Sequence, residues 1–295
     1  MADGRREVAL AQLARELRLA PAGAADLAFL ADVDAADLDA VRRHVVAARY
    51  ARHDHRFERI ATLTRMLPAG LAARVAEAAL GPLVAARTAG RMEPTEAARL
   101  AERLSPAFLA DVTTHLDPAR AGAIVAALPQ PLLVEVGRLL LARGDHLTLG
   151  RFVGVMPAAA SVRVVADAAP GDLLAIALHA EDAAGLDEVL AALPDTTLLA
   201  TLAAAADDGG GAAVDLIGLV GRTSTVRLLD LLPDLPRPRQ RALAAAVVRA
   251  HAWLHVLPAL VHVEPVALRT LLSLPEIADP ALLGELLGTP TARRP

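Results

Sequence analysis

Two histidines near the C-terminus have the type and spacing for metal chemistry. His251 and His255 are four residues apart. On a helix this spacing presents both imidazoles to one side, where they can share a zinc or copper ion. A catalytic zinc site also needs a third ligand and a base, but Ala252 stands where the metalloprotease motif has glutamate. The alternative is two histidines beside Trp253 on a partly buried helix face, so the sequence predicts no bound metal here.

A dense basic stretch is the second candidate site, and it suits anion binding. We define the candidate basic surface as Arg49, Arg52, His53, His55, Arg56 and Arg59. Such a surface could bind a phosphate, an acidic protein partner or an anionic membrane. The alternative is an ordinary solvent-exposed helix face, on which arginine takes the place of lysine because the chain contains no lysine. A metal shared by His53 and His55 would need a break in the helix, since residues two apart point to different sides.

Other residue groups that could support catalysis lack the necessary context. The run Asp207–Gly211 contains three consecutive glycines, but no strand is predicted before it and no lysine follows, as a phosphate-binding loop requires. Ser161, Ser224 and Ser273 have no nucleophile-elbow sequence around them. We therefore expect no enzyme, no catalytic residue and no cofactor.

The elements that must position these residues are set by an internal repeat of twelve residues. Residues 93–140 divide into the units EPTEAARLAERL, SPAFLADVTTHL, DPARAGAIVAAL and PQPLLVEVGRLL. The first three units begin with a capping residue followed by proline, which is typical of a helix start. Apolar residues recur at the fifth, eighth and twelfth places, on one helical face. Each unit therefore predicts one short amphipathic helix.

Helices this short must stabilise one another. An isolated helix is marginal in water below roughly 12–15 residues, so each unit must bury its apolar face against its neighbours. Small residues at the sixth place, Ala98, Ala110 and Gly122, are expected to allow close approach between helices. The sequence thus predicts an all-α fold, a right-handed superhelical array (α-solenoid) of short helices with an atypical N-terminal helical cap.

This pattern of helix starts and ends resembles that of known helical-repeat proteins. The resemblance rests on the segments Leu104-Ser105-Pro106, Leu116-Asp117-Pro118 and Leu128-Pro129. Similar segments recur later, at Leu193-Pro194-Asp195 and Leu232-Pro233-Asp234. The pattern is similar to the N-terminal domain of MgtE-type magnesium transporters and to the helical repeats of the flagellar motor switch protein FliG. The resemblance covers roughly residues 91–232 and implies a right-handed array with a regulatory or docking role. It carries over no functional residue.

Composition narrows the class of protein. The net charge is −4 and aromatic residues are 2% of the chain, which argues against nucleic-acid binding through a basic face or base stacking. The absence of cysteine excludes disulfides and thiol chemistry and is compatible with a cytoplasmic location. Apolar runs are shorter than the roughly 20 residues of a membrane span, so no transmembrane segment is expected. The alanine and arginine usage indicates a high-GC bacterium.

Four segments are predicted along the chain: an N-terminal cap (1–66), the repeat array (67–232), a C-terminal helical segment (233–290) and a disordered tail (291–295). The proline-rich segment 233–241 marks the best candidate boundary. Two functions remain open. The first is a scaffold or adaptor that binds a protein partner along the array, with self-association as a variant. The second is a carrier of an apolar ligand such as a lipid, because alanine, leucine and valine could line a tunnel as well as fill a core.

Overall fold

The computed structural model describes residues 54–277 and, before them, residues 6, 9–10, 13–14, 17, 27, 29–30, 32–34, 37–38, 40–42, 44–45 and 48. Every regular element in this part of the chain is helical, which confirms the predicted all-α array of short helices. The chain divides into two compact units, residues 2–167 and 168–295.

The first unit contains the repeat. Its helices are α3 (Asp54–Arg65), α4 (Ala69–Val75), the π-helical turn η2 (Ala76–Leu80), α5 (Gly81–Ala89), α6 (Pro94–Ala101), α7 (Pro106–Thr113), α8 (Pro118–Ala127), α9 (Gln130–Ala142), α10 (His146–Arg151) and α11 (Ala158–Val165). Each of the four twelve-residue units forms one helix, α6 to α9, as predicted. The fifth place of every unit is buried, as its apolar character requires (Ala97, Leu109, Ala121, Leu133).

The second unit continues in the same style. Its helices are α12 (Pro170–Leu178), α13 (Ala183–Ala192), α14 (Asp195–Asp207), α15 (Gly211–Leu219), α16 (Arg222–Asp230), the 3₁₀ turn η3 (Leu232–Asp234), α17 (Arg237–Arg249), α18 (Trp253–Leu260) and α19 (Pro265–Leu272). The glycine run after α14 is a short turn, as expected for a loop. Gly209 and Gly210 have φ of +82° and +83°, a left-handed conformation that favours glycine.

Helix starts follow the predicted capping chemistry at two of three positions. The Ser105 hydroxyl accepts a hydrogen bond from the Phe108 N–H at 3.4 Å. The Asp117 carboxylate accepts one from the Ala119 N–H at 3.2 Å. Glu93 is the exception, because it precedes α6 without a side-chain hydrogen bond to the helix. Local caps therefore define where α7 and α8 begin.

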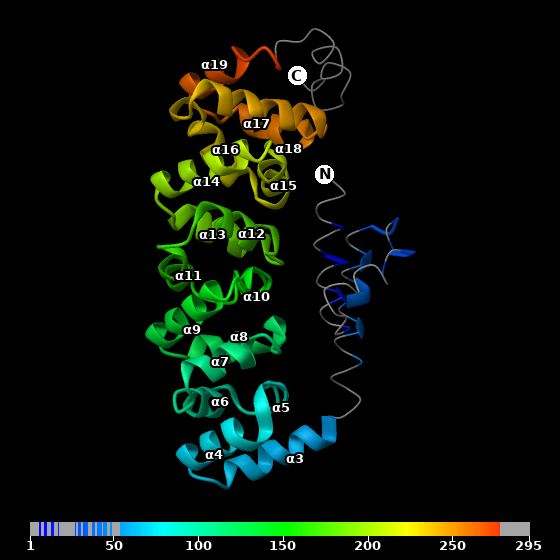
Figure 1. Cartoon of the computed structure of the whole chain (residues 1–295), viewed down its shortest axis with the longest axis vertical. Coiled ribbons are helices and arrows are strands. Elements are labelled where there is room, and N and C mark those ends of the chain that lie inside the picture. The colour runs from blue at the N-terminus through cyan, green and yellow to red at the C-terminus, as the bar shows by residue number, and fades with distance from the viewer. Residues whose placement is uncertain are drawn as a thin grey trace. The chain divides into compact units, whose positions relative to one another are not determined.

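Within the first unit most helices pack against the helix two places along the chain, whereas α10 packs against its neighbour α9. One row contains α3, α5, α7, α9 and α11 in successive contact, and a second row contains α4, α6 and α8. Figure 1 shows these helices following one another in chain order, from α3 in blue to α11 in green. Since consecutive helices alternate between the rows, the apolar faces of both rows meet in the interior. The interior between the rows is where a core, or a cavity, must lie.

Three segments differ from what the sequence predicts. The sequence predicts one helix over about 69–87, but η2 and Gly81, whose φ is +72°, interrupt it. It predicts an insertion or turn after Leu140, but this segment contains α10, which Asp145 caps by accepting from the Thr148 N–H at 3.1 Å. It predicts one helix over about 239–257, but the helix ends at Arg249 and restarts at Trp253.

The proline-rich segment 233–241 packs within the second unit. Gln240 is buried, and its amide nitrogen donates to the carbonyl oxygens of Leu232 and Leu235 at 3.0 and 2.8 Å. The Arg237 guanidinium donates to the Ser273 carbonyl oxygen at 2.6 Å. The division between the two units falls at residue 167 instead. The boundaries of the four predicted segments stay predictions.

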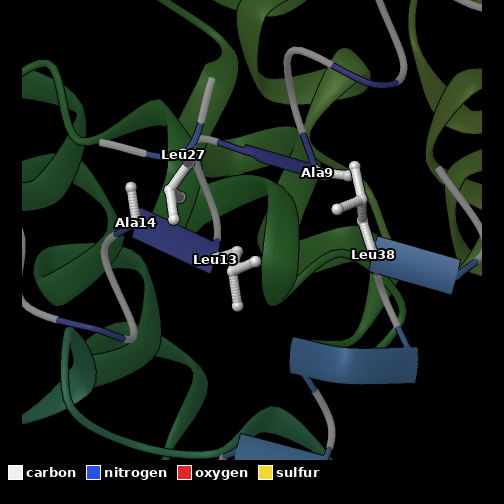
Figure 2. Packing of buried hydrophobic residues seen from close by; sticks show 5 residues of the cluster. All are labelled: Ala9, Leu13, Ala14, Leu27 and Leu38. Atoms are coloured by element: carbon white, nitrogen blue, oxygen red, sulfur yellow. The ribbon is translucent and has the colours of Figure 1, made fainter. Parts of the chain in front are cut away.

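Part of the predicted N-terminal cap can be described. Ala9, Leu13, Ala14, Leu27 and Leu38 are buried and form one apolar cluster, shown as sticks in Figure 2. Partly buried apolar side chains pack against the cluster (Leu10, Leu30, Val33). The segment before α3 therefore has apolar packing of its own.

Two helical stretches bear on membrane insertion. The continuous stretch 69–89 is long and apolar enough to cross a membrane, and so is the bent pair α13 and α14 if counted as one span. Length and composition are the only basis for either statement, and core helices of soluble proteins satisfy the same criteria. The expectation of no transmembrane segment stays a prediction.

Carboxylates from neighbouring helices hold several helix starts. The Asp187 carboxylate on α13 accepts from the Gly221 N–H at 3.0 Å and from the Ser224 hydroxyl, at the start of α16. Glu77 in η2 accepts from the Ser105 N–H, just before α7, at 2.6 Å. These contacts join segments 28 to 37 residues apart. They satisfy first-turn donors that a helix cannot satisfy itself.

Two helices approach closely where α9 meets α11. A β-carbon on Gly137 would lie 2.5 Å from Cγ2 of Val164, whereas a β-carbon on Gly122 would have nothing within 4 Å. Close packing at Gly122, which its small size suggested, is therefore wrong. The contact between α9 and α11 depends on Gly137.

We expect Gly137→Ala to destabilise the protein by about 1–2 kcal/mol, because overpacking costs more than the helix propensity gained. Val164→Ala should remove the clash, so that adding Gly137→Ala to it costs nothing or stabilises. Gly122→Ala is the matched control and should stabilise by up to about 1 kcal/mol. Urea unfolding of all four variants measures these differences. Equal effects of the two glycine substitutions would contradict the contact.

The Glu77 contact predicts a dependence of stability on pH. The hydrogen bonds from the Ser105 backbone and side chain hold the pKa of Glu77 below its ordinary value of 4.5. A lowered folded-state pKa gives stability above the ordinary value, and this stability is lost as the pH falls through the folded-state pKa.

Glu77→Gln should therefore lower stability near neutral pH by a few tenths of a kcal/mol, a small effect because Glu77 is exposed. The difference from wild type should shrink as the pH falls below 4.5 and be lost below the folded-state pKa. Urea midpoints measured from neutral pH into the acid range test this, with the exposed Glu188→Gln as the control. A difference of the same size across this range would rule out the charged contact.

Candidate functional site: an apolar cavity in the first unit

An apolar cavity of about 110 Å³ lies inside the unit formed by residues 2–167. Its lining starts at Thr64 in α3 and ends at Met156 beyond α10, with contributions from every helix between them. The lining side chains are almost all alanine, leucine, valine, isoleucine and methionine. The interior between the two helix rows is therefore partly hollow. The sequence left this question open, because the same residues can line a space or fill it.

The cavity is elongated. It follows α3, α5, α7 and α9, which pack in succession. Neighbouring helix axes lie roughly 8–10 Å apart, so three such steps extend over roughly 25–30 Å.

Three lining residues are polar, and they differ in one respect. The Thr64 hydroxyl donates to the Ile60 carbonyl oxygen at 2.8 Å, and the Thr113 hydroxyl donates to that of Leu109 at 2.8 Å. Thr88 is buried, with 4% of its surface exposed, and its hydroxyl has no hydrogen-bond partner in the structure. The wall therefore offers one unsatisfied polar group.

The second unit has a smaller interior space. A cavity of about 40 Å³ is lined by apolar residues together with Gln240 and Trp253. The Gln240 amide is fully engaged, as described above, and the Trp253 indole N–H has no partner in the structure. A space of this size can hold water, which needs about 10–15 Å³ for each molecule. This cavity is too small for a chain-like ligand.

The candidate basic surface is only partly described. Arg49, Arg52 and His53 lie outside the described residues, as do the side chains of His55 and Arg56 in α3. Arg59 is in α3 and is exposed. Binding of an anion or partner by this surface stays a prediction.

The two C-terminal histidines do not share a helix. His251 lies between α17 and α18 with φ of +50°, and His255 is in α18. The Ala252 N–H donates to the Val247 carbonyl oxygen at 3.1 Å, and the His251 N–H donates to that of Val248 at 3.1 Å. This pair of bonds is a Schellman motif, in which glycine usually occupies the left-handed position. The helical i, i+4 geometry assumed for a metal pair is therefore wrong.

The remaining polar residues give a similar result. Within residues 54–277 and the earlier described positions, no group of three or more His, Cys, Asp or Glu is placed to hold a metal ion. The sequence predicts a solvent-facing polar column on the repeats (Glu96, Arg99, Arg103, Asp111, His115, Arg120). Arg99, Arg103, His115 and Arg120 are exposed, whereas Glu96 and Asp111 are half-buried and pair with Arg65 and Arg143. Arginine–aspartate pairs recur at a separation of 32 residues (Arg143–Asp111, Arg227–Asp195, Arg239–Asp207).

These pairs were missed at the sequence level, although the signal is simple: an aspartate followed 32 residues later by an arginine. Their geometry is close, with nitrogen–oxygen distances of 2.6, 2.6 and 2.8 Å. The hydrogen bond from Arg239 lowers the pKa of Asp207. Because the pairs are largely exposed, they fix orientation more than they add stability.

Comparison with known proteins adds no relative: no protein-family model, curated protein or solved structure matches this chain. The resemblance to MgtE-type and FliG repeats stays a prediction.

Replacing His251 tests whether its role is conformational. We expect His251→Gly to stabilise the protein by about 0.5–1 kcal/mol, because glycine adopts the left-handed conformation without strain. His251→Ala keeps the β-carbon and should give no gain. Thermal unfolding in the presence of a chelator, and again with added zinc, measures both. A zinc-dependent rise in the melting temperature of wild type that His251→Gly abolishes would restore the metal interpretation.

Proposed function

We propose that the chain is a non-enzymatic helical-repeat protein that binds an apolar ligand inside the unit formed by residues 2–167. The observation that supports this function is the cavity of about 110 Å³ between the two helix rows. Apolar walls favour removal of an apolar ligand from water in proportion to the area buried. From the sequence, a protein scaffold is the favoured function and a carrier the alternative. Because of the cavity, we propose the carrier first.

A scaffold or adaptor remains the second candidate. Arg99, Arg103, His115 and Arg120 are exposed on consecutive repeats, which is what a polar docking face needs. Together with Glu96 and Asp111 they form a mixed polar face, which would suit a partner of complementary charge pattern. Both functions fit a cytoplasmic location, which is part of the proposal.

Native mass spectrometry of protein purified gently from its own host separates the two functions. Added mass of a few hundred daltons that dissociates as a small molecule supports the carrier. A second polypeptide of defined mass supports the scaffold. The bare chain alone would count against a stably bound ligand.

The cavity can also be blocked. Ala101 lines it and is buried, whereas Ala107 on α7 is exposed and outside the lining. We expect Ala101→Phe to weaken binding of diphenylhexatriene, a rod-shaped fluorescent hydrocarbon, by more than tenfold, because the ring would occupy the ligand's space. Ala107→Phe should bind the probe as wild type does.

Circular dichroism would check that both variants fold. Probe binding that survives in folded Ala101→Phe would place the probe elsewhere and remove the support for the cavity as the site.

A further inference from the structure

Thr88 differs from six other helical threonines of the described chain. Their hydroxyls donate to the carbonyl oxygen four residues back (Thr62, Thr64, Thr113, Thr201, Thr225, Thr270). Thr88 lies in α5 and is 4% exposed, yet its hydroxyl makes no such bond. Thr88 also lines the cavity, so a ligand in the cavity lies next to this residue.

An unsatisfied hydroxyl in an apolar wall is costly. Burying a hydroxyl without a partner sacrifices the hydrogen bonds it made to water. Valine has nearly the same shape and would avoid this cost. A threonine at this position is therefore explained best if a partner arrives from outside the chain.

Water is a poor candidate for that partner. A buried water molecule needs two to four polar contacts to be held, and apolar cavities stay dry. The other two polar side chains in the wall, Thr64 and Thr113, have already committed their hydroxyl hydrogens to backbone carbonyls. The ligand itself must supply the missing group.

The wall also restricts the ligand's charge and shape. No lining side chain is charged, so an ionised head group at Thr88 would be left without a counter-ion. The lining follows four successive helices, so an elongated ligand suits it. The ligand should therefore be neutral where it meets Thr88 and extended along the cavity.

We propose that the cavity binds a linear hydrocarbon chain carrying one neutral oxygen function, an alcohol, ester or protonated acid, which hydrogen-bonds the Thr88 hydroxyl. This specificity rests on the proposed function, since it presumes that the cavity holds a ligand. Thr88 acts as the residue that distinguishes an oxygenated chain from a plain hydrocarbon.

Displacement of diphenylhexatriene by 1-decanol and by decane tests the assignment on the full-length protein. The two competitors share a chain and differ in the hydroxyl group. Thr88→Val should weaken 1-decanol about tenfold and leave decane unchanged, because the lost hydrogen bond belongs to the alcohol alone. Thr88→Ser keeps the hydroxyl and should retain the preference for 1-decanol.

Thermal unfolding without ligand provides a second readout that does not depend on binding. Thr88→Val should melt at or above the temperature of wild type, because a methyl group replaces an unsatisfied hydroxyl. A lower melting temperature would mean that the hydroxyl already has a structural partner, which overturns the proposal.

The outcomes separate the two levels of inference. If wild type binds neither the probe nor either competitor, the proposed function fails. If wild type binds the chains but Thr88→Val affects 1-decanol and decane equally, the cavity is a general apolar site and the assignment to Thr88 fails.

Discussion

The shortness of the helices is the constraint on which this structure depends. The described α-helices contain six to thirteen residues, a length at which an isolated helix is marginal or unstable in water. From α3 to α9 each helix of the first unit is therefore held by the helix two places along, and consecutive helices alternate between two rows. Alternation brings two apolar faces together. Where alanines alternate with leucines on those faces, the side chains leave a space between the rows, and the cavity follows from the packing.

The sequence predicted the parts of the fold that local chemistry encodes. Proline after a capping residue located α7 and α8 closely, and the apolar period identified their buried faces. Two helix breaks were not predicted from the sequence, and only one of them lacks a local signal. His251 takes a left-handed conformation without being glycine, so the end of α17 carries none of the usual signal. The interruption at Gly81 was visible as glycine followed by proline, but a strong apolar pattern on both sides concealed it.

The candidate site was beyond prediction for a different reason. Lining and packing use the same alanine, leucine and valine side chains, so composition cannot distinguish a hollow interior from a filled one. Thr88 looks like any other helical threonine in the sequence, and only its missing bond to the helix backbone sets it apart. The residues that sequence reasoning did favour, the basic stretch and the histidine pair, were chosen for their chemistry alone. The histidine pair does not have the helical i, i+4 geometry, because His251 lies just beyond the end of α17 and His255 lies in α18.

The recurring separation of 32 residues between paired arginine and aspartate has a consequence for how such a chain can evolve. Arrays of this kind grow and shrink when whole repeats are duplicated or deleted, and a twelve-residue unit is the natural step. The separation between Asp111 and Arg143 is not a multiple of twelve. Gain or loss of one unit between them would leave both charges facing the wrong neighbours. Asp207 and Arg239 each lie twelve residues after Asp195 and Arg227, so the same pairing recurs one unit further along the chain. A duplicated unit can keep this pairing only where the 32-residue separation is preserved.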